Sequence, residues 1–282
     1  MTRSLLSNGL SHAIEDYPEG IVLPIDKPYR WTSADVIRKV KYLAIRHFGK
    51  KNLKVGHAGT LDPLATGILL VCIGPATKRA EELQASAKQY LAGVTFGATT
   101  PSFDLEKDID HEFPGCRPSE RQILDVLPRF VGEHMQVAPL FSAKSVDGVR
   151  AYETARKLYG QGRLEEGSDL IQANKVNIYS LELESYSVKT FACPEIPEGR
   201  SSRINVADLS GHSLPTAMLR VECSKGTYIR ALARDLGEAL GGGAFLSSLR
   251  RTKNGGFGIE DAISLDEVIS LLPDFITFST RS

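Results

Sequence analysis

A short stretch near residue 60 places a carboxylate where it could do chemistry. The segment GHAGTLDPLATGILLVCIG, residues 56–74, sets Asp62 and Pro63 between glycines, with His57 upstream and an apolar run downstream. An aspartate with an ordinary pKa near about 3.9 is ionised at neutral pH, so it could act as a nucleophile or as a general base. Aspartate before proline is also typical of a turn or a helix N-terminus. The stretch alone favours this structural interpretation, and only the rest of the chain can favour a chemical one.

Charge is unevenly distributed along the chain, although the formal net charge is zero. The segment between Asp35 and Asp62 has no acidic residue and carries a first basic cluster: Arg38, Lys39, Lys41, Arg46, Lys50, Lys51 and Lys54. A second basic cluster lies near the C-terminal end: Lys225, Arg230, Arg234, Arg250, Arg251 and Lys253. Two such clusters in a neutral chain indicate a localised anionic partner, with solvated helix faces as the structural alternative.

Size and composition limit the possible classes of protein. With 282 residues, of which 42% are hydrophobic and 24% charged, the chain can form one large domain or one domain with an appendage. No apolar run approaches the roughly 20 residues that span a bilayer, and the start of the chain lacks a signal-peptide core, so we expect a cytoplasmic location and no membrane partner. The cysteines are scattered, and neither a P-loop nor G-x-G-x-x-G occurs, so we expect no metal site and no cofactor.

The elements that position Asp62 come from the first hundred residues. The patterns predict a strand over 20–28, a helix over 32–48, a buried strand over 67–74, a helix over 77–87 and a strand over 89–97. Residues 1–19 precede them as a mobile, variable tail. The first helix can be capped by Thr32 or Ser33, and its apolar residues share one face: Val36, Ile37, Val40, Leu43 and Ala44.

The second half alternates strands and helices without a regular βαβ rhythm. We expect a helix over 119–130, a strand over 170–188, a strand over 218–224 and a turn followed by a helix over 225–240. The polar stretch from Cys193 to Pro215 is unusually long for a connection in a compact domain, so we interpret it as a loop insertion.

Five segments together carry a resemblance to a known family: GIVLPIDKPYRWTS, GHAGTLDPLATGILLVCIGPATK, KQYLAGVTFG, PLFSAKSVDGVRAYETAR and CSKGTYIRALARDLGEALG. In order and spacing they resemble the tRNA pseudouridine synthase B (TruB) family over residues 20 to about 253. The resemblance implies a mixed α/β (α+β) fold with a central, mostly antiparallel sheet flanked by helices and loops. It also implies that the chain isomerises uridine in RNA.

The resemblance assigns roles to individual residues. It implies that Asp62 is the catalytic aspartate, that Arg230 pairs with it and holds it ionised, and that Tyr90 stacks on the target base and accepts the C5 proton. Without the motifs, Arg230 would be interpreted as a solvated arginine in the first turn of a helix and Tyr90 as a core aromatic.

Four further residues match positions that line the substrate site in the family. His57 corresponds to a histidine that holds the flipped target loop, Tyr228 and Leu249 line the site, and Lys27 belongs to the DKP motif. Tyr228 and Arg230 would point about 200° apart if both were helical. We therefore expect the helix to begin near Arg230, with the preceding GTY extended.

The chain departs from the family pattern at two places. Arg30 in DKPYRWTS stands where glycine is usual, which leaves the local turn geometry open. Many family members add a C-terminal PUA domain, but residues 254–282 are too few to form one. We therefore expect a single catalytic domain over residues 20–282, with the 193–215 insertion and a short C-terminal tail.

These observations predict an enzyme that converts uridine 55 in the T loop of tRNA to pseudouridine, with the tRNA T arm as its partner and no obligate protein partner. Two alternatives stay open at this point. One is a protein that binds and folds tRNA without chemistry, and the other is a pseudouridine synthase that acts on another RNA. The choice between a nucleophilic route and a glycal route for the aspartate also stays open.

Overall fold

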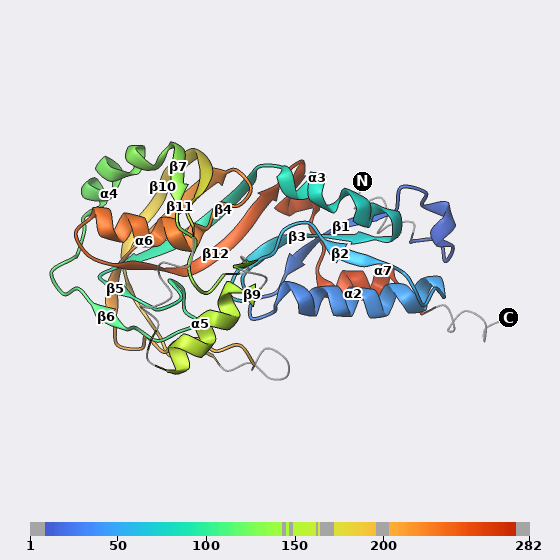
Figure 1. The fold of residues 1–282 in the computed structure, drawn as a ribbon, viewed down its shortest axis with the longest axis horizontal. Helices are drawn as coiled ribbons and strands as arrows, with labels where there is room; N and C mark the ends of the chain where they lie inside the picture. The colour runs from blue at the N-terminus through green and yellow to red at the C-terminus, as the bar shows by residue number, and fades with distance from the viewer. Residues whose placement is uncertain are drawn as a thin grey trace. The chain divides into compact units, whose positions relative to one another are not determined.

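The computed structural model describes residues 9–142, 145–146, 149–161, 163, 172–195 and 203–274. The remaining positions, which include parts of the expected tail, of the segment PLFSAKSVDGVRAYETAR, of the strand expected from Leu170 and of the insertion, lie outside the described residues. The chain forms two compact units (Figure 1). Unit 1 comprises Met1–Tyr90, Pro197–Ile204 and Arg250–Ser282, and unit 2 comprises Leu91–Ile196 and Asn205–Leu249.

Unit 1 is built on β1 (Ile21–Lys27), β2 (Val55–His57) and β3 (Thr66–Ile73). Both β1 and β2 pair antiparallel with β3, and the end of β12 (Ala244–Asn254) pairs with it in parallel. All residues of β3 after Thr66 are buried, as expected for a continuous apolar strand with partners on both edges. The register places Lys27 opposite Gly67, and therefore brings the end of β1 to the start of β3.

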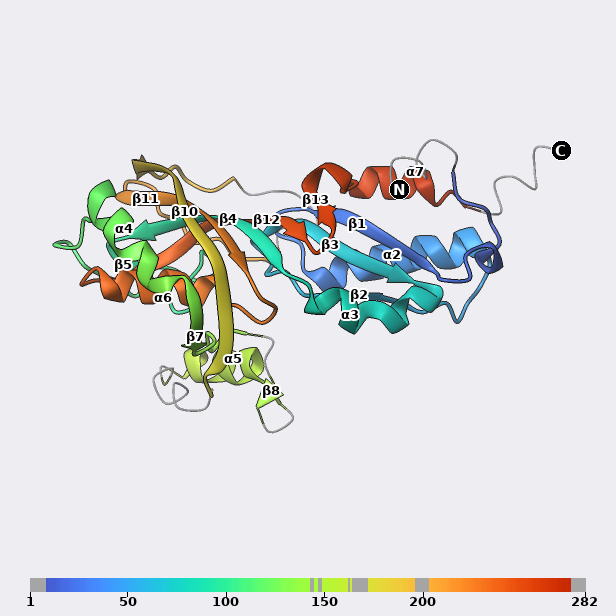
Figure 2. The same cartoon turned by 90° about the horizontal axis from the view of Figure 1, so that it is seen from above.

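The helices of unit 1 follow local sequence signals. The long helix α2 (Ser33–Phe48) begins at a capping box formed by Thr32 and Asp35 and ends at Gly49 in the left-handed conformation. Its residues Val36, Val40 and Ala44 are fully buried, which confirms the expected apolar face. Figures 1 and 2 show α2 and α7 (Leu265–Leu271) beside the strands of this unit.

The remaining elements of unit 1 are short: η1 (Ile14–Asp16), η2 (Gly74–Arg79), α3 (Ala80–Ala85), β13 (Phe257–Gly258) and η6 (Ile259–Asp261). The helix expected over 77–87 is therefore a 3₁₀ turn followed by a brief α-helix. The described part of the expected mobile tail is packed, because Leu10 and Ile14 are buried and the Tyr17 ring meets that of Phe48 edge-on at 6.3 Å. Apolar contacts that are distant in sequence decide this packing.

Unit 2 contains the longest strand pair of the chain. Its strand order is β12, β4 (Lys88–Phe96), β11 (Ser213–Cys223), β10 (Asn174–Thr190) and β7 (Gly132–Gln136). Both β4 and β12 have residues in each unit. Figure 2 shows β10 in yellow as a long bent strand next to β11, with which it pairs antiparallel. The expected mixed α/β fold with a mostly antiparallel sheet is confirmed.

Helices and short hairpins complete unit 2. The helices are α4 (Glu120–Val126), η3 (Leu127–Phe130), α5 (Ala151–Gly160) and α6 (Ile229–Ala239), and the hairpins are β5 (Ala98–Thr99) with β6 (His111–Glu112) and β8 (Ser145–Val146) with β9 (Val149–Arg150). Ser119 forms a capping box at the start of α4, as its position before the apolar pattern indicates.

The expected loop from Cys193 to Pro215 is too long at its C-terminal end. Strand β11 begins at Ser213, and Pro215 pairs with Val188 inside the sheet. Leu214, Pro215 and Thr216 are buried there, so packing overrides the proline signal that indicated a loop. Part of the remaining described segment also packs, since Ala207 is buried and its N–H donates to Leu105 O at 2.7 Å.

Candidate active site

Asp62 lies in the loop between β2 and β3, on a half-buried turn. No helix follows it, since the chain enters β3 at Thr66, so the helix-cap interpretation of this aspartate is wrong. The turn interpretation holds, because Ala65 N–H donates to Asp62 O at 3.1 Å. Gly67 at the end of the loop has a φ of +96°, and a Cβ there would lie 2.2 Å from Arg251 O. Only glycine allows the neighbouring strand to approach this closely.

Buried side chains hold the backbone on both sides of Asp62. Ser33 Oγ donates to Leu61 O at 3.0 Å and accepts from Leu61 N–H at 2.9 Å. Lys27, which has no exposed surface, donates its Nζ protons to Pro63 O at 3.1 Å and to the carbonyls of Pro28 and Trp31 at 3.0 and 2.5 Å. The loop that presents the carboxylate is therefore fixed by groups from β1 and α2.

The electrostatics of unit 1 are set by burial around this loop. Burial lowers the pKa of Lys27 to about 7, while the nearby charge of Asp62 acts in the opposite direction. Burial is also the main cause that lowers the pKa of His57, followed by the positive charge of Arg251. The His57 imidazole is therefore neutral at pH 7. Its buried Nδ1 atom has no hydrogen-bond partner among the described residues.

The structure shows how Arg30 is accommodated at a position where the family pattern has glycine. Its φ is +61°, so the backbone keeps the left-handed conformation that glycine adopts readily and that costs other residues free energy. The side chain is buried, and its guanidinium donates to Ile204 O at 2.5 Å. The turn therefore has a backbone conformation that favours glycine, although a large side chain occupies the position.

Tyr90 lies on β4, at the boundary of unit 1, and only 8% of its surface is exposed. It shares the buried side of the strand with Ala92, Val94 and Phe96, as the alternation indicates. The ring is therefore held by packing at its strand position, and its role as a base-stacking residue stays a prediction.

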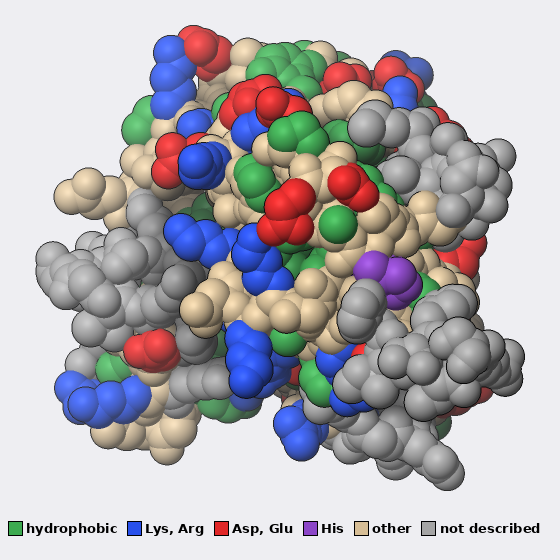
Figure 3. Space-filling view, turned by 90° about the vertical axis from the view of Figure 1, so that its right-hand side faces the viewer, with side chains coloured by type: hydrophobic (Ala, Val, Ile, Leu, Met, Phe, Trp, Pro, Cys, Tyr) green, Lys and Arg blue, Asp and Glu red, His purple; other side chains and the backbone are tan. Residues whose placement is uncertain are grey.

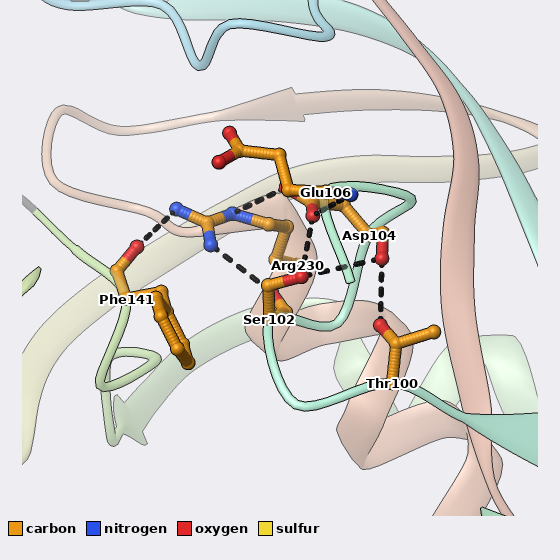
Figure 4. A network of polar contacts seen from close by, with 6 residues as sticks. All are labelled: Thr100, Ser102, Asp104, Glu106, Phe141 and Arg230. Atoms are coloured by element: carbon orange, nitrogen blue, oxygen red, sulfur yellow. Dashed lines mark hydrogen bonds and ion pairs between the residues drawn. The ribbon is translucent and has the colours of Figure 1, made fainter. Parts of the chain in front are cut away.

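Arg230 lies in the first turn of α6 in unit 2 and is buried, so the interpretation as a solvated surface arginine is wrong. Figure 4 shows its guanidinium among three acceptors. It donates to Ser102 O at 3.0 Å and to Phe141 O at 2.9 Å, and its Nε lies 3.6 Å from Asp104 Oδ2. These contacts leave little rotational freedom to the side chain, which presents a fixed positive charge.

The loop that receives Arg230 is itself organised by Asp104. Its Oδ1 accepts from Ser102 Oγ at 2.7 Å and from Glu106 N–H at 2.9 Å. Phe103, between the two polar residues, has a φ of +55°, a conformation that costs a non-glycine residue free energy. Sequence reasoning missed Asp104, because a serine two residues before an aspartate signals only a local turn. The partnership with a residue 126 positions later has no local signature.

The other two expected site residues of unit 2 are half-buried. Tyr228 precedes α6 with φ −96° and ψ +110°, and α6 begins at Ile229, so the expected helix start is confirmed to within one residue. The expectation of an extended GTY holds for Tyr228 but is wrong for Gly226, which lies in a turn with φ +81°. The buried Gln136 amide donates to Tyr228 O at 3.2 Å and accepts from Tyr228 N–H at 2.8 Å, which holds this extended segment in place. Leu249 lies on β12.

The structure thus groups the expected site residues by unit. Lys27, His57, Asp62 and Tyr90 belong to unit 1, whereas Tyr228, Arg230 and Leu249 belong to unit 2. The pairing of Asp62 with Arg230 joins residues of the two units and stays a prediction.

Among the residues that the structure describes, no group of three or more His, Cys, Asp or Glu side chains could hold a metal ion. No helix in the same part of the chain is long and apolar enough to cross a membrane.

The two basic clusters differ in how they use their charge. In the second cluster, Arg230 and Arg251 are buried, Arg234 pairs with Asp235 and Arg250 pairs with Asp26, so most of this cluster is committed to contacts within the protein. In the first cluster, the side chains of four lysines have no ion pair or hydrogen bond within the described ranges: Lys39, Lys41, Lys51 and Lys54. The first cluster therefore has more positive charge available to bind the anionic partner that the sequence predicts.

Two protein-family models match most of the chain, from residue 46 to residue 273. Residues 46–229 match the TruB family pseudouridylate synthase N-terminal domain, and residues 230–273 match the tRNA pseudouridylate synthase B C-terminal domain. A protein of Phocaeicola vulgatus named tRNA pseudouridine synthase B is 45% identical over 251 residues, which cover 89% of this chain and 92% of that protein. A protein of the same name from Thermus thermophilus is 39% identical, and the match covers 86% of this chain and 76% of that protein.

Solved structures share the fold. A chain in the crystal structure of a Cbf5–Nop10–Gar1 complex matches 90% of this chain and 54% of its own length, with a TM-score of 0.56 and 28% identity. A chain in the structure of an H/ACA RNP bound to a substrate RNA containing 2′-deoxyuridine gives a TM-score of 0.55 at 25% identity, covering 92% and 56%. The chain therefore spans about half the length of these solved chains.

Proposed function

The chain belongs to the TruB family of pseudouridylate synthases, and we propose that it converts uridine 55 in the T loop of tRNA to pseudouridine. The observation that carries the proposal is Asp62, a half-buried carboxylate on a loop whose backbone is held on both sides by Ser33 and Lys27. A carboxylate that served only as a turn residue would not need this support from two other elements.

The proposed reaction needs no change of redox state. The N1–C1′ bond of uridine breaks, the uracil turns, and a C5–C1′ bond forms; C5 then loses its proton and N1 carries one in the product. We assign to Asp62 one of two roles, attack on the ring or ribose as a nucleophile, or abstraction of a ribose proton to leave a glycal. Either role requires an ionised and oriented carboxylate, which a neighbouring buried arginine would favour. We assign this part to Arg230.

The other site residues have supporting roles in the proposal. Tyr90 stacks on the base and takes the C5 proton. His57, neutral at pH 7, contacts the flipped target loop through hydrogen bonds, and a neutral ring costs less to bury against a base than a charged one. Tyr228 and Leu249 complete the lining of the pocket. Extrusion of the base from its stack costs a few kcal/mol, and stacking on an aromatic side chain returns about 1–3 kcal/mol.

The decisive experiment replaces Asp62 by asparagine, which keeps the shape and removes the charge. Tritium release from tRNA transcripts labelled at uridine C5 measures the isomerisation, because the C5 proton is lost only when pseudouridine forms. We expect no release with Asp62→Asn and an RNA affinity within about threefold of wild type, since binding depends mainly on contacts with phosphates. The matched control is Asp125→Asn on α4, an exposed residue that forms an ion pair with Arg121 on the surface.

The same assay separates the alternatives. An active wild-type protein and an inactive, RNA-binding Asp62→Asn variant would exclude a protein that only binds and folds tRNA. Turnover by the variant at the wild-type rate would reject the catalytic assignment of Asp62. Release from a ribosomal RNA fragment but not from tRNA would favour the alternative of another RNA substrate.

We further propose that the T arm is the part of tRNA that the protein binds, in the cytoplasm and without an obligate protein partner. The lysines of the first basic cluster support this proposal, and Figure 3 shows Lys and Arg side chains in blue at several places on the face it displays. We expect an isolated T-arm stem-loop to react with an efficiency within about tenfold of full-length tRNA, or about 1.4 kcal/mol. A loss of several hundredfold would mean that contacts outside the T arm are needed.

A further inference from the structure

Arg251 belongs to the second basic cluster by sequence, but its charge is not on the surface. Only 1% of the residue is exposed, and among the described residues it is the largest fully buried side chain. It lies on β12 opposite Gly67 of β3, so its backbone runs beside the end of the loop that carries Asp62. A buried cation in a protein normally has a carboxylate partner, because desolvation is otherwise too costly.

The guanidinium of Arg251 instead binds three backbone carbonyls. Its Nε donates to Ile68 O at 2.7 Å, its Nη2 to Gly59 O at 3.1 Å and its Nη1 to Thr60 O at 3.4 Å. Within the described ranges, Arg251 forms no ion pair with a carboxylate. A single planar group thus ties the loop preceding Asp62 to strand β3 through three different nitrogen atoms, a fixed geometry that a point-like ammonium does not reproduce.

The anchored carbonyls lie close to the reactive position in the chain. Thr60 is separated from Asp62 by Leu61 alone, whose N–H and C=O are held by Ser33 Oγ. Without the contacts of Arg251, the segment from Gly59 to Thr60 would keep none of the side-chain hydrogen bonds that the structure shows for it. Gly59 has a φ of +95°, so this segment is held in a conformation that other residues rarely adopt.

We propose that Arg251 is a positioning residue for the isomerisation, which fixes the Gly59–Thr60 backbone so that the Asp62 carboxylate keeps its reactive orientation. The inference rests on the proposed function. Misplacement of a catalytic group by about 1 Å can lower a rate by about a hundredfold. Arg251 also acts on the same loop electrostatically, because its positive charge contributes to the lowered pKa of His57.

The test uses two variants at this position and one control. Arg251→Lys keeps the charge but replaces the three donor nitrogens of the guanidinium by one, and Arg251→Gln removes the charge. The control is Arg79→Lys, an exposed arginine of the same unit that pairs with Glu82. Single-turnover tritium release at saturating protein measures the chemical rate constant, filter binding measures the Kd for tRNA, and thermal unfolding reports the folded fraction.

We expect Arg251→Lys to lower the single-turnover rate constant by roughly 10- to 100-fold while the Kd stays within about threefold. Arg79→Lys should match wild type in both. Histidine NMR, with the His57 signal assigned by its loss in His57→Asn, should show a raised His57 pKa in Arg251→Gln and a smaller change in Arg251→Lys. A merely structural role would lower the folded fraction and leave the rate constant of the folded protein unchanged, whereas a positioning role lowers that rate constant at an unchanged Kd.

Several results would overturn the inference. One is a wild-type rate constant in folded Arg251→Lys, and another is a rate that falls only as the folded fraction falls. If Arg251→Lys unfolds at the assay temperature, the rate constant and Kd of Arg251→Gln test the inference in its place. Unfolding of both variants would make Arg251 a structural residue and reject the inference. An inactive wild-type protein would reject the proposed function itself, which distinguishes that failure from failure of this inference alone.

Discussion

The buried Lys27 ammonium makes the stability of this protein depend on pH in an unusual direction. Burial lowers its pKa from 10.5 to about 7 in the folded protein, whereas in the unfolded chain the group has its ordinary pKa. Below pH 7 both states are protonated, and the folded state carries the full cost of a buried charge. Above pH 7 the folded protein loses this proton first, so the unfolded state binds more protons and stability rises with pH.

The size of the effect follows from the pKa difference. A shift from 10.5 to about 7 is equivalent to about 5 kcal/mol over the complete titration, at about 1.4 kcal/mol per pH unit. Between pH 7 and pH 9 the Lys27 ammonium loses its proton in the folded state but keeps it in the unfolded state. The free energy of unfolding therefore rises by about 2 kcal/mol of that total over this range. Burial also raises the pKa of Cys72, to about 11, so thiol titration opposes this trend only at higher pH.

The assay is urea unfolding of wild type and Lys27→Met at pH 7, 8 and 9. We expect the free energy of unfolding of wild type minus that of the variant to increase by about 2 kcal/mol over this range, because all other groups are common to both. Lys51→Met, at an exposed lysine, should show no such trend. A pH-independent difference for Lys27→Met would refute the reasoning. It would mean that the three carbonyl acceptors and Asp62 keep the ammonium charged despite its burial.

Substitutions at three further positions test other parts of the structure. Asp104→Asn leaves Arg230 buried without its carboxylate. We therefore expect the free energy of unfolding in urea to fall by about 1–3 kcal/mol and the turnover to fall as well. Wild-type values of both would show that the 3.6 Å pair is unimportant. Arg30→Gly should be more stable than Arg30→Ala by about 1 kcal/mol, because only alanine retains the free-energy cost of the left-handed backbone. Equal stabilities of the two variants would contradict this explanation. Tyr90→Phe should bind tRNA like wild type but lose much of the turnover in tritium release, and full activity would assign the C5 proton to another group.

Local patterns in the sequence determined most of the elements. The Thr32 cap and the spacing of Val36, Val40 and Ala44 are local signals, so the start of helix α2 could be predicted to within one residue and its end correctly. The continuous apolar run in β3 has the same character, because its composition alone indicates a strand buried on both faces. Five segments together, the one around Asp62 among them, identified the family and indicated the candidate site.

Long-range contacts decided the rest. Arg230 and Arg251 belong to a basic run that is typical of a surface, yet both are buried, because their acceptors come from Ser102 and Phe141 in one case and from Gly59 in the other. The carboxylate of Asp104 was likewise not predictable as a partner. Backbone carbonyls carry no signal in the side-chain sequence, so an arginine that they bind looks like any other arginine.

The same reason explains the errors at the edges of elements. Pro215 indicated a loop because proline cannot donate a hydrogen bond, but the tertiary structure pairs this residue with Val188 and buries it within β11. Leu10 and Ile14 belong to a segment whose local pattern favoured a mobile tail, and burial in unit 1 holds them. The sequence by itself determined which residues are available for chemistry and which segments form elements. Only the tertiary structure decided which charges are buried and what they bind, because burial depends on neighbours that are distant along the chain.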